Sequence, residues 1–131
     1  GNQVSPIQES TGAIDWMSVA VGAFHTCAVK IDGRLFCWGS DSFGQVGNGA
    51  TAGNQVSPVQ ESTGATDWAS VAAASLNTCA VKVDGRLFCW GRDNDGQIGN
   101  GATAGNQISP AQESTGATNW VSVSVGTTHA C

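Results

Sequence analysis

The chain has 131 residues, of which only 11% are charged, and it contains 18 glycines, five tryptophans and no tyrosine. Typical soluble domains have about 25% charged residues, so this glycine-rich composition favours short strands and tight turns over long helices. Ten acidic and five basic residues give a net charge of −5, and the scattered basic residues exclude the clustered basic face of a nucleic-acid-binding protein.

No stretch of the sequence approaches the roughly 18 apolar residues of a membrane span, so we expect no membrane span. The chain also opens without a charged and then apolar leader, which predicts a mature or excised segment.

The sequence repeats with a period of 52 residues. Residues 1–52 and 53–104 differ at 13 positions, and residues 105–131 correspond to the first part of a third copy. We therefore divide the chain into repeat 1 (1–52), repeat 2 (53–104) and half of repeat 3 (105–131), or about two and a half copies.

Each copy begins with two predicted strands. Residues 4–8 form a short extended run, in which Pro6 is tolerable only at a strand start or a sheet edge. A turn follows over residues 10–13. Residues 16–21 alternate apolar and small side chains as a half-buried strand does, and Gly22 ends them.

Residues 26–39, which return almost unchanged as residues 78–91, predict a β-hairpin. A three-residue loop at Ile31-Asp32-Gly33 places Cys27 opposite Cys37, within reach of a disulfide. We therefore predict the disulfides Cys27–Cys37 and Cys79–Cys89. A two-residue loop at Asp32-Gly33 would instead set Cys37 opposite Ala28 and strain the bond.

Two other states of these cysteines remain open at this point. A metal site is one, although the two cysteines of a copy lack the paired close spacings of zinc-binding motifs, and we predict no metal. Free thiols are the other. Disulfides would indicate an oxidising compartment, so we expect an extracellular or cell-surface protein.

The copy ends in a loop over residues 40–43 and a glycine-punctuated turn over residues 44–49. Four short strands per copy make a blade-sized antiparallel sheet, which cannot bury both faces alone. Copies must therefore stack, radially as a β-propeller or linearly as a solenoid. We predict an all-β protein whose two and a half blades are part of a larger propeller or repeat assembly, because closed propellers need about four to eight.

The pattern of residues 16–49 resembles the repeat of the regulator of chromosome condensation family. The residues that match this repeat are Trp16, Val19, Gly22, His25, the segments Cys27-Ala28-Val29, Asp32-Gly33 and Cys37-Trp38-Gly39, and the turn Phe43-Gly44-Gln45-Val46-Gly47 with Gly49. The resemblance implies bladed propellers whose blades share strands between adjacent repeats, and a protein-binding scaffold. The cysteine pair resembles the secreted or surface bacterial branch. Asp41, Asp93, Ala74 and Asn77 depart from the family pattern.

One family member is a nucleotide-exchange factor, but nothing in this sequence matches an exchange-factor loop. His25 and His129 occupy equivalent positions, and Asn77 replaces them in repeat 2, so a hydrogen bond at a turn or strand end explains all three. No nucleophile elbow or phosphate-binding loop is present. We therefore predict no enzymatic activity, cofactor or small-molecule substrate. Asp93-Asn94-Asp95-Gly96 lacks the distal glutamate of a calcium loop and predicts a solvated turn.

The differences between repeats 1 and 2 fall mainly in two segments. Five lie in residues 21–25 and their equivalents, and three lie in residues 40–43 and theirs. Variable loops on a fixed scaffold favour a protein-binding surface, although relaxed drift in exposed loops gives the same pattern. The predicted partner-binding residues are Ala23, Phe24, His25, Ser40, Ser42, Phe43, Ser75, Leu76, Asn77, Arg92, Asn94 and Asp95.

Cys131 aligns with Cys27 and Cys79, but the sequence stops ten residues before its expected partner. Either the chain is a piece of a longer array, or Cys131 is unpaired or bonded to another molecule. Open sheet edges and faces would invite further copies. Our first functional prediction is a non-enzymatic extracellular scaffold that binds a protein partner. The alternative is a structural subunit that assembles with copies of itself into a ring, fibre or surface filament.

Overall fold

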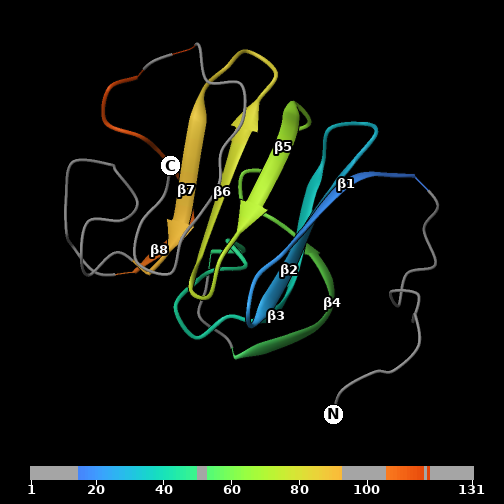
Figure 1. Ribbon diagram of the computed structural model, residues 1–131, viewed down its shortest axis with the longest axis vertical. Helices are drawn as coiled ribbons and strands as arrows, with labels where there is room; N and C mark the ends of the chain where they lie inside the picture. Colours follow the sequence, from blue (N-terminus) through green and yellow to red (C-terminus); the bar gives the residue numbers. More distant parts are fainter. Residues whose placement is uncertain (1–14, 50–52, 93–105, 117, 119–131) are drawn as a thin grey trace.

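The computed structural model describes residues 15–49, 53–92, 106–116 and 118, and every regular element in this part of the chain is a β-strand. The strands form two four-stranded antiparallel sheets that lie side by side (Figure 1). The first blade contains β1 (Trp16–Val21), β2 (His25–Lys30), β3 (Leu35–Ser40) and β4 (Asn54–Gln60). The second contains β5 (Trp68–Ala73), β6 (Asn77–Lys82), β7 (Leu87–Gly91) and β8 (Gln107–Gln112). The predicted all-β class is confirmed.

Within these ranges no helix is long and apolar enough to cross a membrane.

The blades do not coincide with the sequence repeats. Each blade takes three strands from one repeat and its fourth strand from the next, so β4 of repeat 2 completes the first blade and β8 of repeat 3 completes the second. The predicted run 4–8 lies outside the described residues, but its equivalents lie in these two edge strands. Pro58 lies in β4, where the register with β3 shifts between Cys37 and Gly39. Because the ladder is interrupted at this point, the missing N–H of proline breaks no inter-strand hydrogen bond.

The hairpin between β2 and β3 has the predicted register. Cys27 pairs with Cys37, and Val29 pairs with Leu35. The Gly33 N–H donates to the Lys30 carbonyl at 2.9 Å and Gly33 has φ +87°, as a three-residue loop with a left-handed final residue requires. The alternative register, in which a two-residue loop would set Cys37 opposite Ala28, does not occur. The two sulfur atoms lie 2.06 Å apart, a disulfide distance, and those of Cys79 and Cys89 lie 2.04 Å apart.

The core lies between the blades, where two different faces meet. The staple face of a blade carries its two cysteines with one valine and one leucine: Cys27, Val29, Leu35 and Cys37 in the first blade, and Cys79, Val81, Leu87 and Cys89 in the second. The opposite, aromatic face carries Trp16, Val19, Val21, Phe36 and Trp38 in the first blade, and Trp68, Val71, Ala73, Phe88 and Trp90 in the second.

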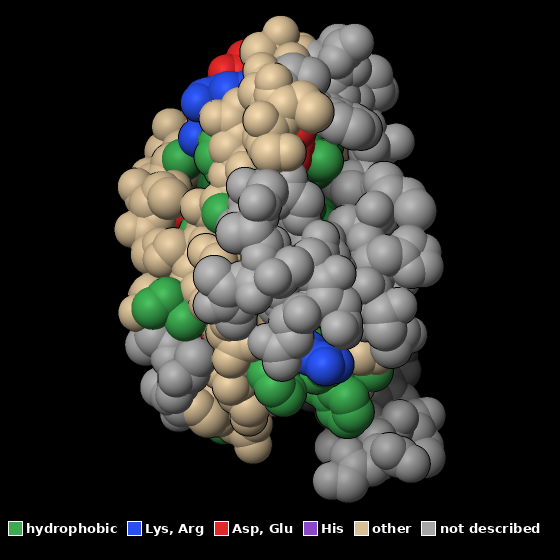
Figure 2. All heavy atoms as spheres, turned by 90° about the vertical axis from the view of Figure 1, so that its left-hand side faces the viewer, with side chains coloured by type: hydrophobic (Ala, Val, Ile, Leu, Met, Phe, Trp, Pro, Cys, Tyr) green, Lys and Arg blue, Asp and Glu red, His purple; other side chains and the backbone are tan. Residues whose placement is uncertain are grey.

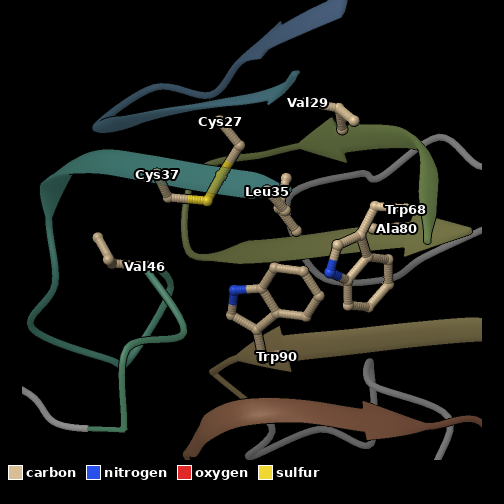
Figure 3. Packing of buried hydrophobic residues seen from close by; sticks show 8 residues of the cluster. All are labelled: Cys27, Val29, Leu35, Cys37, Val46, Trp68, Ala80 and Trp90. Carbon is tan, nitrogen blue, oxygen red and sulfur yellow. A yellow bond between two sulfur atoms is a disulfide. The ribbon is translucent and has the colours of Figure 1, made fainter. Parts of the chain in front are cut away.

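The staple face of the first blade packs against the aromatic face of the second. Figure 3 shows Leu35 and the Cys27–Cys37 pair facing the indole rings of Trp68 and Trp90. Trp68 and Trp90 are only 1% and 0% exposed. Because buried aromatic side chains contribute most to a core of this size, this contact holds the two blades in a fixed relation.

Candidate functional site

The two variable segments of each repeat meet at one end of its blade. In the first blade, the Ser40 N–H donates a hydrogen bond to the Phe24 carbonyl at 2.8 Å. In the second blade, the Arg92 N–H donates to the Leu76 carbonyl at 3.0 Å. The β1–β2 and β5–β6 turns lie at the lower end of Figure 1, and the β2–β3 and β6–β7 hairpin loops lie at the upper end. We call these the turn end and the hairpin end.

Most of the predicted partner-binding residues that the structure describes reach the surface at the turn end. Phe24 is 61% exposed. Ala23 and Ser42 are also exposed, and the remaining residues are half-buried: Ser40, Phe43, Ser75, Leu76 and Arg92. Figure 2 shows basic side-chain atoms among hydrophobic side chains at its lower end, whereas basic and acidic side chains lie together at its upper end. Asn94 and Asp95 lie outside the described residues.

His25 and Asn77 lie beneath this surface, not on it, with exposures of 3% and 2%. The prediction that their side chains belong to a contact surface therefore needs correction. Both begin a strand that is covered by other parts of the chain, and both use their side chains in hydrogen bonds. The Asn77 Nδ2 donates to the Arg92 carbonyl. This bond agrees with the sequence interpretation that this position supplies a hydrogen bond at a turn or strand end.

His25 forms its hydrogen bond with the other blade, across the interface between them. Its Nε2 lies 2.8 Å from Thr78 Oγ1, and Thr78 Oγ1 lies 2.7 Å from the Gln45 carbonyl. Thr78 has one hydroxyl proton, which the carbonyl must accept, so His25 Nε2 carries the hydrogen of the first bond. The Trp90 Nε1 donates to the same carbonyl at 2.9 Å. The Gln45 carbonyl therefore links the loop after β3 to two strands of the second blade.

Burial lowers the pKa of His25 from 6.5 to about 4. The imidazole is therefore neutral at pH 7, with its Nε2 proton committed to Thr78. A general base needs a pKa near the working pH and access to substrate, and this side chain has neither.

The loop after β3 is fixed from within. Asp41 is fully buried, and its Oδ1 accepts a hydrogen bond from the Val46 N–H at 2.9 Å. Gln45 Oε1 accepts from the Phe43 N–H at 2.9 Å. The Gly49 N–H then donates to the Ile108 carbonyl of β8 at 2.8 Å. Ser42 and Phe43 are thus presented on a loop with a defined backbone.

Sequence reasoning missed the connecting roles of Gln45 and Thr78. Both residue types are unchanged between repeats 1 and 2, since Gln97 and Thr26 occupy the equivalent positions. For Thr78, an unchanged polar residue next to a variable segment was the available signal. The link at Gln45 uses its backbone carbonyl, which the residue type does not reveal. Among residues 15–49, 53–92 and 106–116, no three His, Cys, Asp or Glu side chains gather as a metal site would require. The segment Asp93–Gly96 lies outside these ranges.

Comparison with known sequences identifies the repeat. The regulator of chromosome condensation (RCC1) repeat matches residues 32–81 and 84–131, and a second form of the same repeat matches residues 18–45 and 68–97. The human probable E3 ubiquitin-protein ligase HERC3 is 37% identical over 84 residues, which are 63% of this chain and 8% of that protein. The ultraviolet-B receptor UVR8 of Arabidopsis thaliana is 32% identical over 103 residues, which are 79% of this chain and 23% of the receptor.

Solved structures share the arrangement of the blades. Prp20p of Saccharomyces cerevisiae, a structure reported with its binding properties to Gsp1p and histones, superposes with a TM-score of 0.76 at 24% identity over 88% of this chain and 30% of its own. Yeast RCC1 (Prp20) bound to Kap60 gives 0.75 at 20% identity over 88% and 29%. Human WBSCR16 gives 0.75 at 23% identity over 85% and 28%. The chain spans less than a third of each of these relatives.

Proposed function

The chain belongs to the regulator of chromosome condensation (RCC1) repeat family, and we propose that its blades act as a non-catalytic scaffold that binds a protein partner through the turn end. The observation that carries this proposal is Phe24. Its aromatic side chain is 61% exposed on a turn whose carbonyl is held by the Ser40 N–H. An exposed aromatic group on a fixed backbone is the kind of anchor that dominates protein interfaces.

The composition of the turn end supports the same function. Position 24 is Phe in repeat 1 and Leu in repeat 2, so an apolar side chain is kept while its shape changes. Position 40 changes from Ser to Arg. Each blade would thus offer the partner the same backbone with different side chains. The yeast relative reported in complex with Kap60 supports protein binding as a role for this fold.

The test is photo-crosslinking in the source cells. A photoreactive phenylalanine analogue at Phe24 should give a discrete adduct with another protein. The matched control carries the analogue at Asp84, which is exposed in the β6–β7 loop at the hairpin end. Equal adducts from both positions, or none from Phe24, would refute the turn end as the contact surface.

A second candidate function is self-assembly, which the aromatic face of the first blade favours. Val19 and Val21 are 63% and 71% exposed, whereas their equivalents Val71 and Ala73 are half-buried against the first blade. Trp16 and Trp38 are likewise half-buried, against full burial of Trp68 and Trp90. An apolar sheet face of this size invites another sheet.

Sedimentation of the purified chain tests this candidate. The assembly hypothesis expects the mean particle mass to rise with concentration, and Val19→Glu to abolish the rise. The matched control is Val83→Glu, at a valine that is 72% exposed in the β6–β7 loop and outside the aromatic face. A mass independent of concentration would eliminate self-assembly through this face and leave the scaffold hypothesis unaffected.

We also propose an extracellular or cell-surface location. Two cysteine pairs at disulfide distance support it, because such bonds persist in oxidising compartments and are rare in the cytosol. Protease treatment of intact source cells provides the measurement. Resistance of the chain in intact cells together with cleavage after lysis would contradict the proposal.

A further inference from the structure

A groove of about 420 Å³ runs between the two blades at the hairpin end, opposite the turn end. Its walls come from both hairpin loops, with Ile31 of the first blade and Val83 of the second. Met17 lines it from β1, and the almost fully buried Trp68 lines it from β5. The groove therefore exists only where two blades meet, and neither repeat contains it alone.

The backbone around the groove is fixed before any ligand arrives. The Trp68 N–H donates to the Gly33 carbonyl at 3.1 Å, which joins the two blades directly. A side chain at Gly33 would place its Cβ 2.0 Å from the Thr66 carbonyl oxygen, so the loops touch as closely as glycine permits. The Val83 N–H donates to the Asp67 carbonyl at 2.9 Å. A preformed groove binds without the entropic cost of ordering its walls.

The walls are aliphatic and open to solvent. Ile31 is 70% exposed, Val83 is 72% exposed and Met17 is 50% exposed. Single exposed apolar residues are ordinary, but three that converge on one groove with a tryptophan are the lining expected of a site for an apolar side chain.

The charged residues that line the groove are both acidic, and each forms an ion pair with a basic residue outside the lining. Asp32 and Asp67 line the groove, and no lysine or arginine does. Asp32 accepts hydrogen bonds from Arg34 Nε at 2.7 Å and from the Arg34 N–H at 3.1 Å. Asp67 lies 3.2 Å from Lys82 Nζ and 3.8 Å from Arg86 Nη2. The side chains of Asp32 and Asp67 are 47% and 38% exposed, more than those of the basic residues they pair with. Because a carboxylate has about four acceptor sites, each can bind a further donor. The net charge of −5 adds to the attraction of a cation.

We propose that this groove binds an extended segment of a partner protein in which an aliphatic side chain lies next to a lysine or arginine. The aliphatic side chain lies between Ile31, Val83 and Met17 above Trp68. The neighbouring cation contacts Asp32 or Asp67. The interaction is separate from the proposed turn-end contact, because it occupies the other end of the blades and requires both of them.

The test is a titration of the methyl-labelled full chain with a capped peptide, Ser-Lys-Leu-Lys-Ser, followed by NMR. We expect the methyl signals of Ile31 and Val83 to shift with half-saturation at about 1 mM, a typical strength for a contact of roughly 15 atoms. Val83→Ser should weaken binding about tenfold, since it removes most of one apolar wall. Asp32→Asn should weaken it about threefold and reduce its dependence on salt.

The controls separate a specific site from general stickiness. Val56→Ser removes an exposed valine outside the groove and should leave the affinity unchanged. The peptides Ser-Lys-Ser-Lys-Ser and Ser-Glu-Leu-Glu-Ser should each bind at least about tenfold more weakly. The proposal is overturned by equal binding of the Glu peptide, by an equal effect of Val56→Ser, or by no shift of the groove methyl groups at several millimolar peptide. None of these outcomes bears on crosslinking from Phe24.

Discussion

His25 Nε2 in the first blade and Thr78 Oγ1 in the second lie 2.8 Å apart, in a buried contact between residues 53 positions apart in the sequence. The Thr78 hydroxyl donates a hydrogen bond to the Gln45 carbonyl, and Trp90 Nε1 donates a second one to the same carbonyl. The interface between the blades therefore combines an apolar core with one continuous hydrogen-bonded chain. Because the chain is buried, removing one member leaves the others without partners, so its members should act as a unit.

Thr78→Val should destabilise the protein by about 2–3 kcal/mol. Valine retains the shape of threonine but lacks the hydroxyl group. The buried His25 Nε2 then has no acceptor, and the buried Gln45 carbonyl loses one of its donors. Urea unfolding monitored by tryptophan fluorescence gives the free energy of unfolding. Thr26→Val, at the equivalent but half-buried position of the first blade, should cost less than about 0.5 kcal/mol. Equal losses in the two variants would contradict the role assigned to Thr78.

Stability should fall as the pH drops from about 6.5 to about 4. Burial lowers the pKa of His25 from 6.5 to about 4, so in this window the unfolded chain binds a proton that the folded chain does not. The loss should approach about 3 kcal/mol and level off below pH 4.

His25→Asn is the matched control, because Asn77 occupies this position in repeat 2. The variant should lose this part of the pH dependence while keeping that of the carboxylates. The measurement is the difference in unfolding free energy between pH 7 and pH 4.5 for both proteins. The same difference in both would show that His25 does not titrate in this way.

Gly33→Ala should cost more than Gly64→Ala. Both glycines have positive φ, +87° and +68°, so both substitutions carry the conformational penalty of about 1–2 kcal/mol. Only at Gly33 would the new Cβ meet backbone, 2.0 Å from the Thr66 oxygen, while nothing lies within 4 Å of a Cβ at Gly64. We expect an additional loss of at least about 1 kcal/mol at Gly33, measured by urea unfolding. Equal costs would mean that the β2–β3 loop does not pack against the second blade.

Alkylation of the unfolded chain without reductant should modify at most one of its five cysteines, and alkylation after reduction should modify all five. Intact mass reports both numbers. The double variant Cys27→Ala with Cys37→Ala should lose about 3 kcal/mol of stability, because the bond closes a loop of about ten residues in the unfolded chain. Five modified cysteines without reductant would show that the pairs are free thiols. No modified cysteine would show that Cys131 is bonded to another molecule.

The sequence by itself determined the structure within each hairpin. Asp32-Gly33 and the flanking strands set the pairing of Cys27 with Cys37, because a short loop fixes register and alternation has a period of two. The proline near the start of each copy predicted a strand start or a sheet edge, and Pro58 lies in an edge strand. These are local properties of the backbone, so the nearby residues suffice to predict them.

Only the tertiary structure decided which residues the neighbouring blade covers. His25 lies next to exposed Phe24 in a variable segment, yet it is buried because Thr78 and the loop after β3 meet it. Val19 and Val71 have the same side chain at the same repeat position, and only Val71 is packed against another blade. The hairpin-end groove combines side chains from residues 17 to 83. Burial depends on what packs against a surface, and that partner comes from a distant part of the chain that no local pattern encodes.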